Sequence, residues 1–305
     1  MKIALHSITY AGLFYRGEAL TLEQVFDRAA GYGYEGVEVM AKRPLASPFD
    51  LDSEEARRLR AYAADKGLEL PLLAGYIDLS KPHPVDREKE LVFAQETMRL
   101  ARDLGTPYVR VYAGGETIHE GASLRDQWDW CVRHLRELVP VAERYGVQIA
   151  LEIHTGVAQT VDALLDMLDQ VGSEQVVVVL DPPLLAFRGE PAVEAVQRVS
   201  ARTEIVHAHL GDFIRQPPLV HYEAVPGLAV RYTERLQPVS LGEGMVELEP
   251  FLRALHDLGF QRYVAFEVCT PFHVHHRPPT LADVDAMVEQ GVAWLKQKRA
   301  EIWGA

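Results

Sequence analysis

The segment from Gln148 to Asp181 reads QIALEIHTGVAQTVDALLDMLDQVGSEQVVVVLD and contains a complete strand–helix–strand unit. Short aliphatic runs at 148–153 and 176–180 predict strands, and the amphipathic stretch 161–171 between them predicts a helix. Gly172 directly follows the helical stretch, where a left-handed cap is expected. Strands that are joined by a helix of this kind lie parallel in one sheet, so the segment predicts a βαβ unit.

The same unit recurs along the whole chain. Six further strands are expected at 3–6, 36–40, 69–73, 108–112, 205–209 and 263–267, and further helices at 22–30, 53–66, 87–104, 126–145, 192–201, 250–258 and 281–298. Eight such units can close into a barrel. An open doubly wound sheet is the alternative fold, but the GxGxxG sequence that typically opens the first helix of such a sheet is not found there. No linker divides the chain. We therefore predict an α/β protein that forms a single-domain (β/α)8 TIM barrel over residues 1–305.

The segment from Gly211 to Glu247 is the exception to the regular pattern. It contains several prolines and glycines and lacks a sustained helical period. We expect a long loop after the seventh strand. A loop of this length inside a compact domain is usually a lid or a binding loop. A surface loop without a function or an oligomer contact agrees equally well with the sequence.

Composition and charge exclude several classes of protein. The chain carries 31 basic and 44 acidic residues, a net charge of −13, which disfavours nucleic-acid binding. The longest purely apolar run, 176–180, is too short to cross a bilayer, and the N-terminus lacks a signal-type core. Cys131 and Cys269 form no disulfide framework, which suits a reducing compartment. We expect a cytoplasmic protein without a nucleic-acid or membrane partner, and a homo-oligomer stays open.

Four successive predicted strands end in side chains that can bind a metal. These side chains are Glu152, Asp181, His209 and Glu267. They are separated by 29, 28 and 58 residues, and the first two separations each equal about one βα unit of a barrel. Active sites of such barrels lie at the carboxyl ends of the strands. We therefore expect the four side chains to converge at the mouth of the barrel.

Three carboxylates that converge in this way would repel one another unless a cation offset their charge. Three carboxylates and one imidazole form a mainly oxygen site, which suits Mn2+ or Mg2+ and also admits Co2+ or Zn2+. We therefore predict one divalent metal ion, held by Glu152, Asp181, His209 and Glu267. The alternative for each residue taken alone is a solvated position at the rim.

Strand alternation distinguishes the polar residues around the site. His207 and His209 face the same side, and His209 lies nearer the mouth, so we expect His209 to be the ligand. His207 is then a deeper supporting group, and we include it among the candidates for substrate binding. His154 shares a face with Glu152 and is either a wall residue or a substrate contact.

Three other residues near the site are expected to be buried rather than functional. His6 and Glu38 lie on the first two strands and could line the cavity, but buried, hydrogen-bonded roles suit them better. Cys269 shares a face with Glu267 and is expected to pack there.

Five short motifs extend over nearly the whole chain. They are 33–39 (GYEGVEV), 151–152 (LE), 180–182 (LDP), 206–212 (VHAHLGD) and 241–244 (LGEG). Together they resemble the xylose isomerase-like TIM barrel superfamily. That superfamily includes sugar-phosphate isomerases and epimerases, ketose 3-epimerases, inosose dehydratases and endonuclease IV.

The resemblance implies roles for the residues at the strand ends. In the single-metal epimerases of the superfamily, the four matching positions hold the metal, and the two glutamates act as acid and base on either side of a ketose. Carried over, Glu152 and Glu267 are the proton-transfer pair, and Asp181 and His209 are structural ligands. Arg215, six residues after His209, is implied as a substrate contact; the alternative is a surface cation on a loop.

Two positions depart from particular members. Leu184 stands three residues after the sixth-strand aspartate, where many members have His or Asn. Tyr112 stands at the end of the fourth strand, where endonuclease IV would need a histidine, and the acidic charge also disfavours DNA. The stretch 153–160 (IHTGVAQT) is similar to the corresponding loop of inosose dehydratases.

These observations predict a divalent-metal-dependent isomerase or epimerase of carbohydrate metabolism that acts on a sugar or polyol ketone. It would remove a proton next to the carbonyl, form an enediolate, and return the proton elsewhere or on the other face. A metal-dependent dehydratase, a lyase of the inosose dehydratase type, is the first alternative. A non-catalytic sugar-binding subunit is the second, and the intact Glu152 and Glu267 argue against it.

Overall fold

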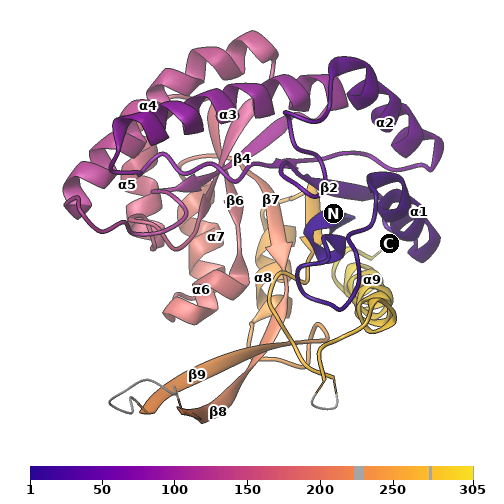
Figure 1. Cartoon of the computed structure of the whole chain (residues 1–305). Helices are drawn as coiled ribbons and strands as arrows, with labels where there is room; N and C mark the ends of the chain where they lie inside the picture. Colours follow the sequence, from indigo (N-terminus) through magenta and orange to yellow (C-terminus); the bar gives the residue numbers. More distant parts are fainter. Residues whose placement is uncertain (223–229, 275–276, 305) are drawn as a thin grey trace.

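A closed barrel of eight parallel strands forms the centre of the protein (Figure 1). The computed structural model describes residues 1–222, 230–274 and 277–304, except for the side chains of 216–222 and 230–235. The barrel strands are β1 (Lys2–His6), β2 (Gly36–Met40), β3 (Leu73–Ala74), β4 (Tyr108–Ala113), β5 (Gln148–Ile153), β6 (Val176–Leu180), β7 (Ile205–Leu210) and β10 (Tyr263–Phe266). Their order around the barrel is β1-β10-β7-β6-β5-β4-β3-β2, which confirms the predicted (β/α)8 TIM barrel.

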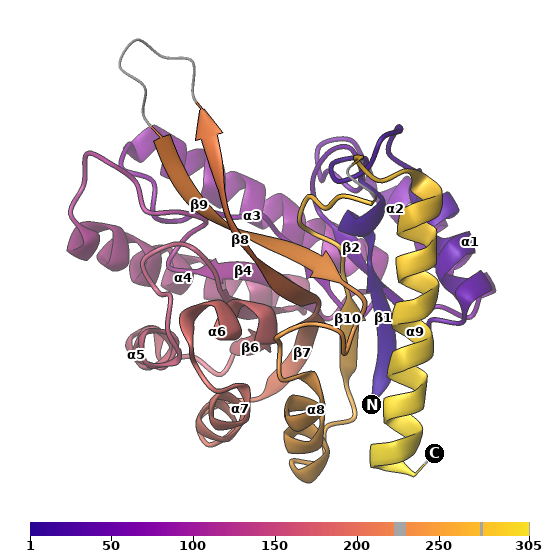
Figure 2. The ribbon, with the colours of Figure 1, turned by 90° about the horizontal axis from the view of Figure 1, so that it is seen from below.

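Helices cover the outside of the barrel (Figures 1 and 2). They are α1 (Leu22–Tyr32), α2 (Ser53–Asp65), α3 (Pro84–Leu104), α4 (Leu124–Tyr145), α5 (Val161–Val171), α6 (Pro182–Arg188), α7 (Ala192–Ser200), α8 (Leu248–Asp257) and α9 (Leu281–Trp303), and a short 3-10 helix (Ser7–Tyr10) follows β1. Figure 2 shows α9 alongside β1. Within the described part of the chain, no helix has both the length and the apolar character needed to span a membrane.

The strand–helix–strand segment 148–180 folds as predicted, and β5, α5 and β6 begin and end at the expected residues. The Thr160 side chain caps α5 by accepting a hydrogen bond from the backbone N–H of Ala163. Gly172 ends the helix with a φ of 67°, a conformation that side chains other than glycine rarely adopt. All residues of β6 are buried, because helices cover its outer face and side chains fill the barrel interior.

The third strand is shorter than predicted. The expected strand at 69–73 is reduced to Leu73–Ala74, and Glu69 contributes only an isolated bridge with Gly36. Pro71 lies between these two points. A proline has no backbone N–H to donate to a neighbouring strand, so it interrupts the hydrogen-bond ladder there.

The segment after β7 is a β-ribbon, and the prediction of a long loop was wrong in this respect. Strands β8 (Asp212–Tyr222) and β9 (Val230–Val239) pair antiparallel as a separate two-stranded sheet, which extends away from the barrel (Figure 1). Pro217 and Pro218, which suggest a loop, lie where the register between the strands shifts. A proline is tolerated at such an irregularity, because the ladder is already interrupted there.

A buried aspartate fixes the base of the ribbon to the chain that follows it. Asp212 is 1% exposed, and its Oδ1 accepts hydrogen bonds from the backbone N–H groups of Phe213 (2.9 Å) and Val246 (3.1 Å). Its Oδ2 accepts from Gly242 (2.9 Å) and Gly244 (2.8 Å). A Cβ atom at Gly244 would lie 2.1 Å from Asp212 Oδ1, so this close approach requires glycine. The carboxylate thus satisfies four amides that would otherwise need other partners.

We predict that Asp212→Ala lowers the free energy of unfolding by about 2 kcal/mol or more, because it removes the acceptor of several enclosed N–H groups. Urea denaturation followed by circular dichroism measures this loss. Asp212→Asn keeps one of the two carboxylate oxygens and should lose less. An alanine variant as stable as the unchanged protein would contradict this role.

Candidate metal centre

Four neighbouring strands carry the predicted ligands to one end of the barrel. Glu152 lies on β5 and His209 on β7, while Asp181 and Glu267 directly follow β6 and β10. The register aligns Glu152 with Val179 of β6, so these strands present their carboxyl ends side by side. Glu152 and His209 are each 1% exposed and Asp181 is 8% exposed. The barrel therefore removes these polar groups almost completely from water.

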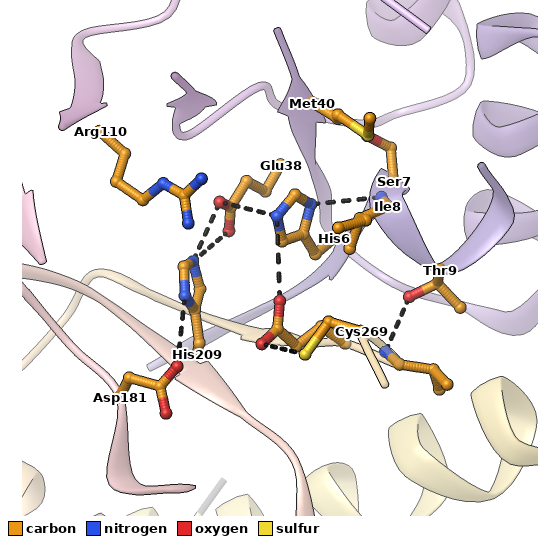
Figure 3. Close-up of polar contacts among 12 residues, drawn as sticks. His6, Ser7, Ile8, Thr9, Glu38, Met40, Arg110, Asp181, His209 and Cys269 are labelled. Atoms are coloured by element: carbon orange, nitrogen blue, oxygen red, sulfur yellow. Dashed lines mark hydrogen bonds and ion pairs between the residues drawn. The ribbon is translucent and has the colours of Figure 1, made fainter. Parts of the chain in front are cut away.

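Three of the four predicted ligands form a tight group. His209 Nδ1 lies 2.5 Å from Glu152 Oε1. The same nitrogen lies 3.9 Å from Asp181 Oδ2 (Figure 3). One ligand atom from each of the three residues lies within 4.8 Å of the others. The side chain of Asp181 is held by the first turn of α6, because its Oδ1 accepts a hydrogen bond of 2.8 Å from Leu184 N. The second oxygen of Asp181 is therefore the one that faces His209.

Glu267 lies at the edge of this group. Its Oε2 is 3.9 Å from His6 Nε2, and its Oε1 accepts a hydrogen bond of 3.1 Å from the Cys269 thiol. Its side chain is 9% exposed. Among the described residues, it does not belong to a set whose ligand atoms all lie within 4.8 Å.

The carboxyl groups of the site differ in their electrostatic environment. Burial raises the pKa of Asp181 well above its ordinary value, and the neighbouring Glu152 and Glu267 raise it further. Burial also raises the pKa of Glu267, and Glu152 adds to this effect. For Glu152, burial acts in the same direction, but Arg110 and His209 outweigh it and hold the pKa below its ordinary value.

The residues present fit a divalent cation. Glu152 Oε1 is buried and lies 2.5 Å from His209 Nδ1, its ion-pair partner, but it has no hydrogen bond of ordinary geometry. An unsatisfied carboxylate oxygen that faces an imidazole nitrogen and a second carboxylate is a typical arrangement of metal ligands. A cation at this place would also offset the repulsion that raises the pKa values of Asp181 and Glu267.

A fourth carboxylate, Glu38 of β2, lies behind His209 and contacts three imidazole rings. Its oxygens are 2.9 and 3.0 Å from His209 Nε2 and 3.4 Å from His6 Nε2 (Figure 3). One of them also lies 2.8 Å from His207 Nε2. Glu38 is fully buried, and His6 Nδ1 accepts a hydrogen bond from Ile8 N, so the expectation that His6 and Glu38 are buried and hydrogen-bonded is confirmed. Because Nε2 of His209 faces Glu38, Nδ1 is the nitrogen left for a metal.

These contacts set the ionisation of the group. Burial alone would raise the pKa of Glu38, but the three histidines hold it well below its ordinary value. Burial alone would lower the pKa of His209, but Glu38 and Glu152 raise it well above its ordinary value. His6 has no such excess of negative neighbours, and burial lowers its pKa to about 3.

The three residues predicted to contact the substrate lie in three different environments. His154 is half-buried beside the site, with its ring 4.2 Å from the Tyr112 ring. His207 is 1% exposed and lies deep in the barrel. Arg215 lies on β8 opposite Leu236 of β9 and is exposed.

Sequence reasoning missed Arg110, which lies on β4 and donates a hydrogen bond of 2.8 Å to Glu152 Oε2. The available signal is its position in the run Val109-Arg110-Val111 of a predicted strand. A charged residue between two aliphatic residues of a barrel strand either faces the interior or covers the outside, and only the register decides. Sequence reasoning also missed the hydrogen bond between Glu38 and His209, because these residues lie far apart in the chain.

The fold and the site define a TIM barrel with a centre suited to a metal at its strand ends. A family model described as xylose isomerase-like TIM barrel matches residues 26–298. The chain therefore belongs to the xylose isomerase-like TIM barrel family, as the sequence motifs indicate.

Individual known proteins are similar over most of their length. A fructoselysine 3-epimerase of Escherichia coli O157:H7 is 23% identical over 276 residues, which cover 86% of this chain and 90% of the relative. An inosose dehydratase of Clostridium perfringens is 22% identical over 262 residues, which cover 82% and 83%. The crystal structure of the IOLI protein with a binding zinc atom has a TM-score of 0.76 at 19% identity and covers 99% of both chains.

We predict that Glu38→Gln weakens Mn2+ binding by about 10-fold or more, because a carboxylate that orients a ligating histidine contributes to metal affinity. Isothermal titration calorimetry measures this change. Glu35→Gln is the matched control, since Glu35 lies on the same segment but bonds Arg299 outside the site. Equal Mn2+ affinity in the Glu38 variant and the control would rule out an orienting role for Glu38.

Proposed function

We propose that the protein is a divalent-metal-dependent isomerase or epimerase that acts on a sugar or polyol ketone. The observation that carries this proposal is the convergence of Glu152, Asp181 and His209 in one buried group, with Glu267 at its edge. The similarity to a fructoselysine 3-epimerase supports the class of reaction and of substrate.

Glu152, Asp181, His209 and Glu267 would hold the metal. When bound, Mn2+ or Mg2+ would polarise the substrate carbonyl and so make a proton on the adjacent carbon more acidic. The mainly oxygen donor set favours these two ions over softer ones, although Co2+ and Zn2+ also accept such ligands. The imidazole of His209 would bind the metal through Nδ1, because Glu38 engages Nε2 and holds the ring in that orientation.

Glu152 and Glu267 are proposed as the proton-transfer pair. One glutamate removes the proton next to the carbonyl to give an enediolate, and the other returns a proton to the opposite face or the neighbouring carbon. Each has one oxygen already engaged, Glu152 Oε2 by Arg110 and Glu267 Oε1 by Cys269. The remaining oxygens, Glu152 Oε1 and Glu267 Oε2, are the ones available to the substrate.

Substrate recognition is assigned to residues at the mouth. His154 stacks on Tyr112 at the edge of the site and offers an imidazole to a hydroxyl group. Arg215, on the ribbon, is proposed to contact the substrate, and this role requires the ribbon to face the bound sugar. Direct contact by His207 stays a prediction, since its position beneath His209 suits a supporting role better.

We predict that Glu152→Gln and Glu267→Gln each lower kcat by about 100-fold or more, because an amide cannot exchange the proton. Incorporation of deuterium into a panel of ketoses in deuterated water, with Mn2+ present, measures the proton transfer directly. The control is Glu143→Gln, an exposed position on α4. Unchanged exchange in the double variant would refute the assignment of this pair.

A dehydratase is the second candidate, because an inosose dehydratase is among the similar proteins. This reaction begins with the same proton removal but then expels a β-hydroxyl group as water. Mass spectrometry of products from ketoses and inososes separates the two reactions. A product of unchanged composition that carries deuterium supports the epimerase, and a product that lacks one water supports the dehydratase. A metal-loaded protein that binds sugars without either result would be a non-catalytic binding subunit.

A further inference from the structure

A buried arginine lies behind Glu152 and is not itself a metal ligand. Arg110 is 4% exposed and lies on β4, where the register pairs it with Ala150 of β5. A guanidinium that is removed from water loses its hydration, so it is tolerated only where its donors find good partners. The partners of Arg110 therefore indicate what it does.

Both terminal nitrogens of the Arg110 guanidinium are hydrogen-bonded, whereas its buried Nε has no hydrogen-bond partner. Its Nη1 donates a hydrogen bond of 2.8 Å to Glu152 Oε2, and its Nη2 donates bonds of 3.2 Å to Gly75 O and to the Tyr112 hydroxyl. The guanidinium carbon lies 4.7 Å from the ring centre of Tyr76 and 4.5 Å from that of Tyr112. Two aromatic rings and a backbone carbonyl thus restrict the orientation of the guanidinium plane.

This fixed guanidinium determines how Glu152 is presented. Oε2 is engaged by Arg110, whereas Oε1 is buried without a hydrogen-bond partner and lies 2.5 Å from His209 Nδ1. A carboxylate with one oxygen held by a rigid donor cannot exchange its two oxygens freely by rotation. Oε1 is consequently the oxygen that faces the candidate centre.

We infer that Arg110 is a positioning residue, which holds Oε2 of Glu152 so that Oε1 alone faces the metal and the reacting carbon. The inference rests on the proposed function, and Arg110 itself does not touch the reacting atoms. A simpler role for Arg110 would be to neutralise the charge of Glu152. That role requires only a positive charge, whereas positioning requires the geometry of the guanidinium. A lysine would supply the charge but not the planar fork that reaches Glu152, Gly75 and Tyr112 together.

The test compares Arg110→Lys and Arg110→Ala with the matched control Arg99→Lys in the full chain. Arg99 pairs with Glu96 and Asp103 on the outer helix α3. Binding of Mn2+ without substrate is measured by calorimetry and by electron paramagnetic resonance. We expect both Arg110 variants to raise the Mn2+ dissociation constant by about 10- to 100-fold, because each loses a group that orients a ligand. The control should leave the dissociation constant unchanged. The kcat should fall while KM changes little.

Added methylguanidinium provides a readout that a merely structural role would not move. It should occupy the space opened in Arg110→Ala and recover part of the Mn2+ affinity and of kcat, but it should not help Glu152→Gln. Arg110→Lys with the Mn2+ affinity and kcat of the unchanged protein would overturn the inference, and so would a folded Arg110→Ala that methylguanidinium leaves unchanged. If the unchanged protein binds no Mn2+, the proposed function fails as well; if it binds Mn2+ and only the arginine variants deviate from expectation, the inference alone fails.

Discussion

The mutual repulsion of carboxylates buried at the carboxyl end of the barrel is the constraint on which the site depends. Glu38, Glu152 and Asp181 are almost completely removed from water, and Glu267 lies close by. A buried negative charge must be paired, protonated or bound to a metal. The barrel pairs the first two with histidines and an arginine. Among the described side chains, no Arg, Lys or His donates a hydrogen bond to Asp181 or Glu267, whose nearest imidazole nitrogens are 3.9 Å away. Burial raises the pKa values of both carboxyl groups.

The site consists of candidate ligands and of a second set of residues that orient those ligands. Glu38 lies deep in the barrel and fixes the ring of His209, and Arg110 fixes one oxygen of Glu152. Glu152 Oε1, Asp181 Oδ2 and His209 Nδ1 are thereby left facing one another. Such supporting contacts fix the geometry of ligands more rigidly than the ligands could do alone, which is what both metal binding and proton transfer require. Asp181 combines both roles, since one oxygen caps α6 and the other faces the centre.

The regular part of the fold could be predicted from the sequence, because each βα unit carries its own local signals. Strand ends place Glu152, Asp181 and His209 within one residue of where hydrophobic runs stop, and the barrel then brings these ends together. Local signals fail where a competing effect intervenes. Pro71 shortens β3, and the ribbon tolerates prolines where its register is irregular.

Pairings across the barrel could not be predicted in the same way. Glu38 and His207 are 169 residues apart, and Arg110 and Glu152 are 42 apart. Their meeting depends on the closure and stagger of the barrel, which the period of a single strand does not contain. Alternation indicates that a residue can face inward, but the partner on another strand follows only from the full register.

Anomalous diffraction from crystals grown with Mn2+ tests the central claim most directly. The account predicts a manganese peak bonded to Glu152, Asp181, His209 and Glu267, with His209 binding through Nδ1. A well-ordered crystal in which these side chains enclose no manganese, or in which the ion binds elsewhere while Glu152 and Asp181 point apart, would contradict it.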